Sequence, residues 1–86
     1  MSINKKEILE NICYTELVYD RINKKLNVMF SKKQIEEFIF NIVEGTEIKL
    51  FSKIGKNFYI TNRENNIKFT VNSNTFRIIT VDRIEK

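Results

Sequence analysis

The sequence predicts an α+β domain in which about three N-terminal helices pack on one face of a C-terminal four-stranded antiparallel meander. Apolar residues recur every three or four positions in residues 1–44, and they alternate with polar residues in residues 45–86. The first pattern gives a helix one apolar side, and the second gives a strand one apolar face. Because 86 residues are too few for two cores, we expect one domain over 1–86, helical in 1–44 and β-sheet in 45–86.

Two short helices are expected first. Asn4 and Glu7 have capping-box spacing, with Asn in the capping role, and indicate a helix that continues through residues 8–12. A second helix is expected to begin near Thr15, since apolar residues then recur every four positions. The apolar side of this helix is expected to comprise Tyr14, Leu17, Val18, Ile22 and Leu26.

The third helix has the clearest start signal. Ser31 and Gln34 form an S-x-x-Q capping box, and Phe30 and Ile35 occupy the positions of a hydrophobic staple. Gly45 stands where a left-handed residue commonly ends a helix. The apolar stripe between these signals consists of Ile35, Phe38, Ile39, Ile42 and Val43.

After Gly45 the apolar period changes to two, which predicts strands. A first strand is expected near residues 48–53, with Ile48 and Leu50 inward and Phe51 outward, followed by a turn at 54–57. Two further strands are expected near 58–61 and 67–72, and a last one at 75–81 whose inward face is ambiguous. The inward residues of the two middle strands are expected to be Phe58, Ile60, Ile67, Phe69 and Val71.

Strand alternation then places a polar set on the opposite face. A tyrosine ring, hydroxyl groups and cations on one sheet surface are the side chains that stack on bases and contact phosphates. An ordinary solvated sheet face contains the same residue types, and that alternative stays open. The expected ligand-binding residues are Tyr59, Thr61, Arg63, Lys68 and Thr70, with Asn72 beside them, and Arg77 joins them if Phe76 and Ile78 point inward.

The excess positive charge supports this surface. Residues 45–86 carry eight Lys and Arg against four Asp and Glu, whereas residues 1–44 carry seven of each. A second basic group lies around the loop between the second and third helices. It is either a contact for a polyanion or acidic partner, or a set of lysines that offsets a helix dipole. This group consists of Lys24, Lys25, Lys32 and Lys33.

Several kinds of chemistry are not expected. The chain has no histidine and one cysteine, Cys13, so histidine-based catalysis and a cysteine metal cluster are excluded. The carboxylates fall mostly on expected helix exteriors. We therefore expect no enzyme, no metal site and no cofactor, and we expect Cys13 to be a buried small hydrophobe. No apolar run approaches the roughly 18 residues of a membrane span, which favours a cytoplasmic protein.

The segments at residues 11–26, 55–62 and 72–84 resemble a family of small Firmicute proteins known only as a domain of unknown function. The resemblance extends over nearly the whole chain and implies one compact domain. It brings no activity, cofactor or site residue with it. The last of these segments, Asn-Ser-Asn-Thr-Phe-Arg-Ile-Ile-Thr-Val-Asp-Arg-Ile, is the most specific.

Two functions are compatible with these features. The first is a non-enzymatic binding module whose basic sheet face holds a phosphate-bearing ligand, either a nucleotide, including a signalling nucleotide, or a nucleic acid. The second is a small protein-binding adaptor or inhibitor, of the kind that mobile elements use against host enzymes, acting through exposed Phe40 and Phe51. A homodimer formed through an uncovered strand edge or apolar patch is a variant of the second.

Overall fold

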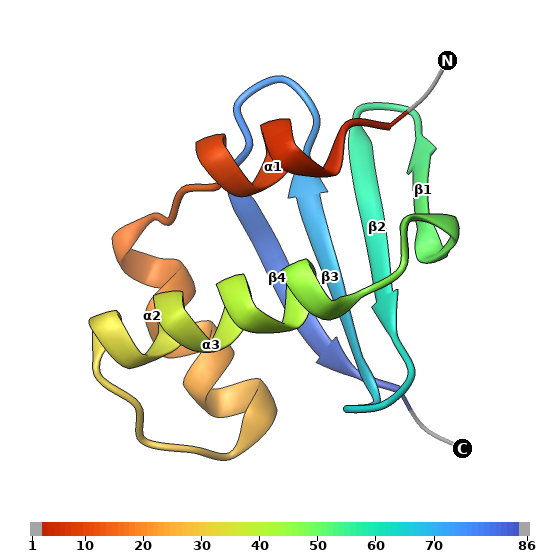
Figure 1. Ribbon diagram of the computed structural model, residues 1–86. Helices are drawn as coiled ribbons and strands as arrows, with labels where there is room; N and C mark the ends of the chain where they lie inside the picture. Colours follow the sequence, from red (N-terminus) through yellow and green to blue (C-terminus); the bar gives the residue numbers. More distant parts are fainter. Residues whose placement is uncertain (1–2, 85–86) are drawn as a thin grey trace.

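The computed structural model describes residues 3–84 and contains three helices followed by a four-stranded antiparallel sheet (Figure 1). The strand order is β1-β2-β3-β4, which is the predicted meander. The α+β class and the order of its elements are therefore confirmed. The elements are α1 (Lys5–Asn11), α2 (Glu16–Leu26), α3 (Lys32–Gly45), the short 3₁₀ helix η1 (Ile48–Leu50), β1 (Phe51–Ile54), β2 (Asn57–Asn62), β3 (Ile67–Asn72) and β4 (Ile78–Arg83).

The helix starts follow the capping signals. The Asn4 side chain accepts a hydrogen bond from the Glu7 N–H at 3.0 Å, and Ser31 and Gln34 form the complete reciprocal capping box. In α2, Val18, Ile22 and Leu26 are buried as predicted, but Leu17 is 78 % exposed. Leu17 lies one residue, or about 100° of helix rotation, from the buried stripe, so its predicted inward position was wrong.

Two predictions for the segment after α3 were also wrong. Gly45 is the last residue of the helix and has no positive φ, and the C-cap is Thr46, which has an extended backbone. Residues 48–50 form the 3₁₀ turn η1 instead of a strand. This turn shifts the phase of the alternation that follows it. As a result Phe51 begins β1 pointing inward, pairs with Ile60, and is only 6 % exposed.

The inner face of the sheet carries the core. One inward row crosses all four strands through Phe51, Ile60, Phe69 and Val81, and each of these residues is buried. In Figure 1, α1 and α3 cross in front of this sheet. Their buried residues, including Ile8 and Ile39, join the same apolar cluster. Burial of a side chain of this size contributes about 1.5–3 kcal/mol, so this layer supplies much of the stability.

The helix α2 lies along the outer edge of β4 (Figure 1). Asp82 and Arg83 leave opposite faces of β4, because they are consecutive strand residues, yet both contact α2. Lys25 Nζ lies 3.0 Å from Asp82 Oδ1, and the Arg83 guanidinium donates to the carbonyl oxygen of Leu26. The helix therefore straddles the edge, and the predicted packing of all three helices on one face is not confirmed.

The segment between α1 and α2 closes the rest of that edge. The Cys13 N–H donates to the Phe76 carbonyl and the Ile78 N–H donates to the Cys13 carbonyl, each at 2.9 Å. These bonds form a parallel bridge between Cys13 and Arg77. Cys13 is half-buried, not fully buried as predicted, because it belongs to this surface segment.

The last strand begins at Ile78, three residues later than predicted. The preceding loop is held by the Asn72 side chain, which accepts hydrogen bonds from the N–H groups of Asn74 and Thr75. A register shift then leaves Ile79 without a partner, since Val71 pairs with Ile78 and Thr70 pairs with Thr80. This bulge explains why the period of two gave no clear inward face for this segment.

Substitution of the two glycines distinguishes the observed end of α3 from the predicted one. We expect Gly45→Ala to raise the free energy of unfolding by about 0.4–1 kcal/mol, because a Cβ there meets no atom within 4 Å and φ is negative. Gly55→Ala should lower it by about 1–2 kcal/mol, because Gly55 has φ of +61°. Urea unfolding measures both. Destabilisation by Gly45→Ala as large as that by Gly55→Ala would contradict the observed helix end.

Candidate functional site

The outer face of the sheet carries three cross-strand rows of mainly polar residues. The pairing register places Tyr59 beside Thr70, and Thr61 beside Lys68, on this face. Four of the six predicted ligand-binding residues therefore lie on this face within paired strands. The three rows are Ile54, Asn57 and Asn72; Ser52, Tyr59, Thr70 and Thr80; and Thr61, Lys68 and Asp82.

The middle row consists of one ring and three short hydroxyl side chains. Tyr59 is half-buried, and the Asn57 side-chain amide lies 3.5 Å from its hydroxyl. Thr70 is only 8 % exposed, because it lies between Tyr59 and Thr80 in the centre of the sheet. Its hydroxyl is therefore less accessible than the predicted ligand-binding role requires, whereas the tyrosine ring is partly open to solvent.

The two predicted arginines lie at the margins of this face. Arg77 is exposed and precedes the inward Ile78, and its carbonyl accepts the N–H of Asn72 at 2.9 Å. Strand alternation therefore puts Arg77 on the outer face, beside Asn72. Lys68 is four residues from Asn72, or about 13 Å along β3, so Lys68 and Arg77 do not converge on one point. Arg63 follows β2 in an exposed turn, apart from the other five residues.

Cations from α2 extend the outer face beyond the sheet. Arg21 Nη1 donates to the Ile79 carbonyl at 3.4 Å, and Lys25 pairs with Asp82. Lys24 shares with them a shallow hollow of about 600 Å³, which Leu17 and Asp20 complete. We call this surface the basic face, and we define it by Arg21, Lys24, Lys25, Lys68 and Arg77 together with the acidic Asp20 and Asp82.

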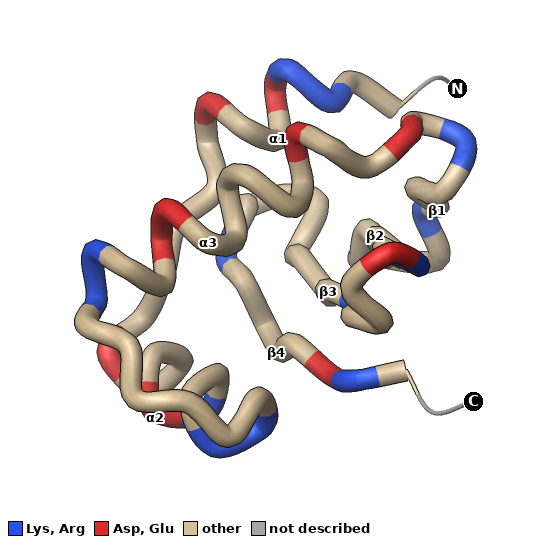
Figure 2. The backbone as a smooth tube through the Cα atoms, turned by 60° about the horizontal axis from the view of Figure 1, so that its bottom comes forward, with Lys and Arg blue, Asp and Glu red and all other residues tan. Residues whose placement is uncertain are grey.

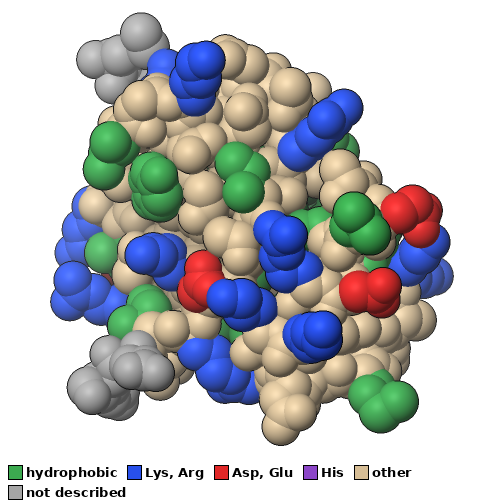
Figure 3. Space-filling view, turned by 180° about the vertical axis from the view of Figure 1, so that it is seen from behind, with side chains coloured by type: hydrophobic (Ala, Val, Ile, Leu, Met, Phe, Trp, Pro, Cys, Tyr) green, Lys and Arg blue, Asp and Glu red, His purple; other side chains and the backbone are tan. Residues whose placement is uncertain are grey.

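The basic face has a net charge of +3, since five cations stand against two carboxylates. Figure 3, which views the molecule from behind the sheet, shows Lys and Arg side chains over much of this side and few acidic ones. One of the two carboxylates, Asp82, is already paired with Lys25. Such an excess of one sign concentrates anions near a surface.

The sequence analysis missed Arg21 and grouped the α2 lysines differently. Arg21, Lys24 and Lys25 have the spacing of one helix side, which was visible in the sequence. That this side borders the sheet was not. The four lysines predicted to form one group around the loop between α2 and α3 do not act together. Lys24 and Lys25 border the hollow beside the sheet, whereas Lys32 pairs with Glu16 at 2.7 Å and lies over the Tyr19 ring. Figure 2 shows the charged positions of α2 and α3 along the backbone.

One known protein family matches this chain. Residues 6–82 match the model of a family described as "Protein of unknown function (DUF3781)". The chain belongs to this family. The match contains α2, α3, all but the first residue of α1 and all but the last residue of the sheet. Both α2 and the outer face therefore lie within the DUF3781 domain. Neither the search of curated proteins nor the search of solved structures found a match. The Firmicute origin implied by the resemblance stays a prediction.

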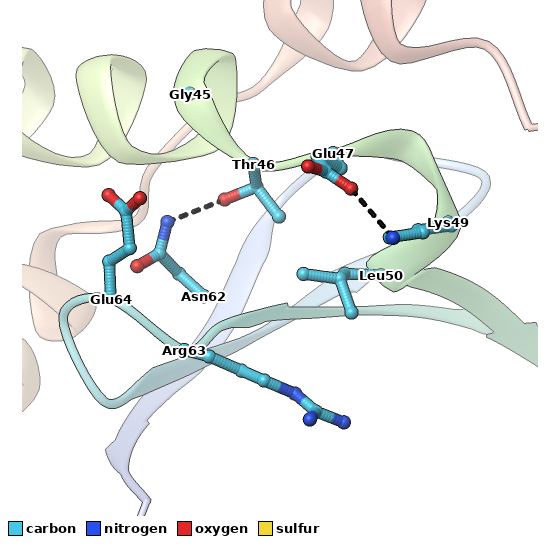
Figure 4. Close-up of a pocket in the computed structure, with 8 residues that line it drawn as sticks. All are labelled: Gly45, Thr46, Glu47, Lys49, Leu50, Asn62, Arg63 and Glu64. Atoms are coloured by element: carbon cyan, nitrogen blue, oxygen red, sulfur yellow. Dashed lines mark hydrogen bonds and ion pairs between the residues drawn. The ribbon is translucent and has the colours of Figure 1, made fainter.

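A second hollow of the DUF3781 domain, of about 430 Å³, lies between the end of α3 and the turn after β2 (Figure 4). Inside it, Asn62 Nδ2 donates to Thr46 Oγ1 at 2.8 Å, and Thr46 Oγ1 donates to the Ile42 carbonyl at 2.7 Å. Figure 4 shows that the Arg63 side chain points away from this pair. The rim balances Lys49 and Arg63 against Glu47 and Glu64, so it has no net charge.

The Thr46–Asn62 pair is a structural link between α3 and β2. Both residues are buried, and in residues 3–84 no buried side-chain nitrogen or oxygen lacks a hydrogen-bond partner. The Asn62 side-chain oxygen also accepts the N–H of Asn65 at 2.8 Å, which holds the turn. We therefore assign this hollow a role in stability.

Removal of the Thr46 hydroxyl tests this link. Thr46→Val keeps the shape of the side chain but leaves the buried Asn62 amide without its acceptor, so the free energy of unfolding should fall by about 1–3 kcal/mol. Thr61→Val serves as the control, because Thr61 precedes Asn62 in β2 and lies on the outer face of the sheet. It should change the free energy of unfolding by less than about 0.5 kcal/mol. Equal effects of the two substitutions in urea unfolding would contradict the assignment.

The predicted protein-interface residues have different environments. Phe51 is buried in the core and cannot contact a partner in this fold, so that assignment was wrong. Phe40 is 40 % exposed and borders a hollow with Glu36, Glu37 and Asn41. Of the two residues on which the adaptor hypothesis depends, Phe40 is exposed and Phe51 is not. Partners and a homodimer stay predictions.

Two features are absent from residues 3–84. No helix within residues 3–84 combines the length and the apolar character that crossing a membrane requires. In the same residues, no three or more His, Cys, Asp and Glu side chains gather into a group that could hold a metal ion.

Two stacked tyrosines, Tyr14 before α2 and Tyr19 within it, have raised pKa values. The rings of Tyr14 and Tyr19 stack with centroids 5.4 Å apart, and the Tyr19 hydroxyl donates to Glu36 at 2.7 Å. Burial, and then the hydrogen bond and charge of Glu36, raise the pKa of Tyr19 to about 12. Burial also raises the pKa of Tyr14. These groups lie apart from the basic face and stabilise the contact between the two helices.

This contact should weaken in alkali. The unfolded chain ionises Tyr19 near its ordinary pKa of 10.0, whereas the folded chain keeps the proton until about pH 12. The stabilisation is therefore complete below pH 10 and is lost as the pH rises from 10 to 12. Urea unfolding at increasing pH should show this loss, and Tyr19→Phe should reduce it. An identical pH dependence in Tyr19→Phe would contradict the role of this phenol.

Proposed function

We propose that this DUF3781 domain is a non-enzymatic module that binds the phosphate backbone of a nucleic acid on its basic face. The observation that carries the proposal is the junction of α2 and β4, where the Lys25–Asp82 pair connects the cations of the helix with those of the sheet. Five cations then contribute to one positive surface on the same side of the molecule. A polymer of phosphates is the ligand whose charge pattern matches an extended surface of this kind.

The spacing of the cations favours a polymer over a single nucleotide. Lys68 and Arg77 are about 13 Å apart along the strand direction, and Arg21 and Lys24 lie beyond β4 on another element. A small ligand normally enters a concave pocket that buries most of its surface. The three hollows described above are lined by residues other than Tyr59, Lys68 and Arg77. The basic face thus offers several separate phosphate contacts, and none of these hollows encloses the ring of Tyr59.

Salt dependence tests the proposal directly. If three to five cations contact phosphates, the logarithm of the association constant should fall with the logarithm of salt concentration with a slope of about −2 to −4. Fluorescence anisotropy with labelled single-stranded and duplex oligonucleotides of about 20 nucleotides, at about 50 to 200 mM salt, measures the slope. Absence of binding to both oligonucleotides at the lowest salt would remove the proposal.

A pair of charge-matched variants locates the contacts. Lys24→Gln with Lys68→Gln removes two cations of the basic face, and the slope should become shallower by about 1.4 for single strands. Lys6→Gln with Lys33→Gln removes the same charge from exposed positions in α1 and α3 and should leave the slope unchanged. Equal losses of affinity in both double variants would show attraction to net charge alone and contradict a defined face.

A further inference from the structure

The middle row of the outer face contains one aromatic ring, that of Tyr59. The other two tyrosines, Tyr14 and Tyr19, stack on each other, whereas no aromatic ring in residues 3–84 packs on Tyr59. The neighbours of Tyr59 across the strands are Ser52 and Thr70, whose side chains are much shorter than a phenol. The ring is therefore the largest side chain of its row, and it remains partly open to solvent.

Cations lie on both sides of this ring along the strand direction. Lys68 is a diagonal cross-strand neighbour of Tyr59, since it lies two residues before Thr70, and such neighbours are about 7–8 Å apart. On the other side, the diagonal neighbour is Asn72, and Arg77, the residue before β4, lies next to Asn72. The order across the face is thus cation, ring, cation. Lys68 and Arg77 are both exposed, so their charged groups are accessible to a ligand.

We infer that the nucleic acid bound by the basic face is single-stranded, and that one unpaired base stacks on Tyr59 while the flanking phosphates contact Lys68 and Arg77. This inference rests on the proposed function and specifies its ligand class. In a duplex both faces of each base are covered by neighbouring bases, so Tyr59 has no free base to contact. In a single strand a base can turn onto an aromatic side chain, and such stacking tolerates any base sequence.

The hydroxyl row also fits a single strand. Ser52 and Thr80 provide hydroxyl groups that both donate and accept hydrogen bonds, and they lie at the two ends of the row, about 14 Å apart across the four strands. The row is level, because its side chains apart from Tyr59 are short. A splayed nucleotide can lie across it. The α2 cations Arg21 and Lys24 then lie beyond β4, where they can contact the continuing backbone.

Abasic strands separate base stacking from phosphate binding. The probes are a single-stranded oligonucleotide, its duplex, and a single strand of the same length without bases. The wild-type protein should bind the base-containing single strand about 5- to 150-fold more tightly than the abasic strand, the range for loss of one stacked base. Tyr59→Leu should remove this preference. Tyr59→Phe, which keeps the ring, should retain it, and urea unfolding of both variants checks that the fold is intact.

A second measurement leaves Tyr59 unchanged. The chain contains no tryptophan, so in the variant with Tyr14→Phe and Tyr19→Phe the only fluorescent phenol is Tyr59. Saturation with the base-containing strand should quench this fluorescence, and the abasic strand should not.

The outcomes distinguish the two levels of the proposal. Equal affinity for the single strand, the duplex and the abasic strand, with no effect of Tyr59→Leu, overturns the stacking inference but leaves phosphate binding by the basic face intact. Absence of binding to all three probes overturns both. A preference for the base-containing strand that survives in Tyr59→Leu would place the stacking contact elsewhere and also overturn the inference.

Discussion

The contact between α2 and the edge of β4 is the constraint on which the fold and the candidate site both depend. Its apolar part is the buried stripe of Val18, Ile22 and Leu26, and its polar part holds Arg21, Lys25 and Arg83 against backbone or side-chain partners. An exposed strand edge presents unpaired N–H and C=O groups that can recruit another chain. Here the helix and the Cys13 bridge cover that edge. The same arrangement brings the helix cations beside the outer face of the sheet.

This arrangement also separates stability from recognition. The inward row from Phe51 to Val81 is buried against the layer formed by α1 and α3, and the buried Thr46–Asn62 link is fully hydrogen-bonded. The outer rows contribute little apolar area. Charged groups, hydroxyl groups or a single ring in these rows therefore lower the stability of the core little. The sheet cations of the basic face, Lys68 and Arg77, therefore lie where the core depends on them least, whereas Arg21 and Lys25 also hold α2 on β4.

The sequence predicted well those elements whose signals are local. The capping residues Asn4 and Ser31 were identified because their hydrogen bonds close within three residues, and the alternation in β2 and β3 was regular. Errors arose where the backbone changed phase. The 3₁₀ turn at residues 48–50 moved Phe51 from the outer to the inner face, and the bulge at Ile79 concealed the inward residues of β4. Neither irregularity has a strong sequence signal, because each involves only a few residues.

By itself, the sequence determined the three helices, the meander and a shared polar face that contains Tyr59, Thr61, Lys68 and Thr70. Local periodicity sets which side of an element is apolar, so these features need no knowledge of distant contacts. Only the tertiary structure decided that α2 lies beside β4 and adds Arg21, Lys24 and Lys25 to that face. The position of a helix relative to a sheet edge depends on packing between residues more than fifty positions apart, such as Lys25 and Asp82, and no local pattern records it.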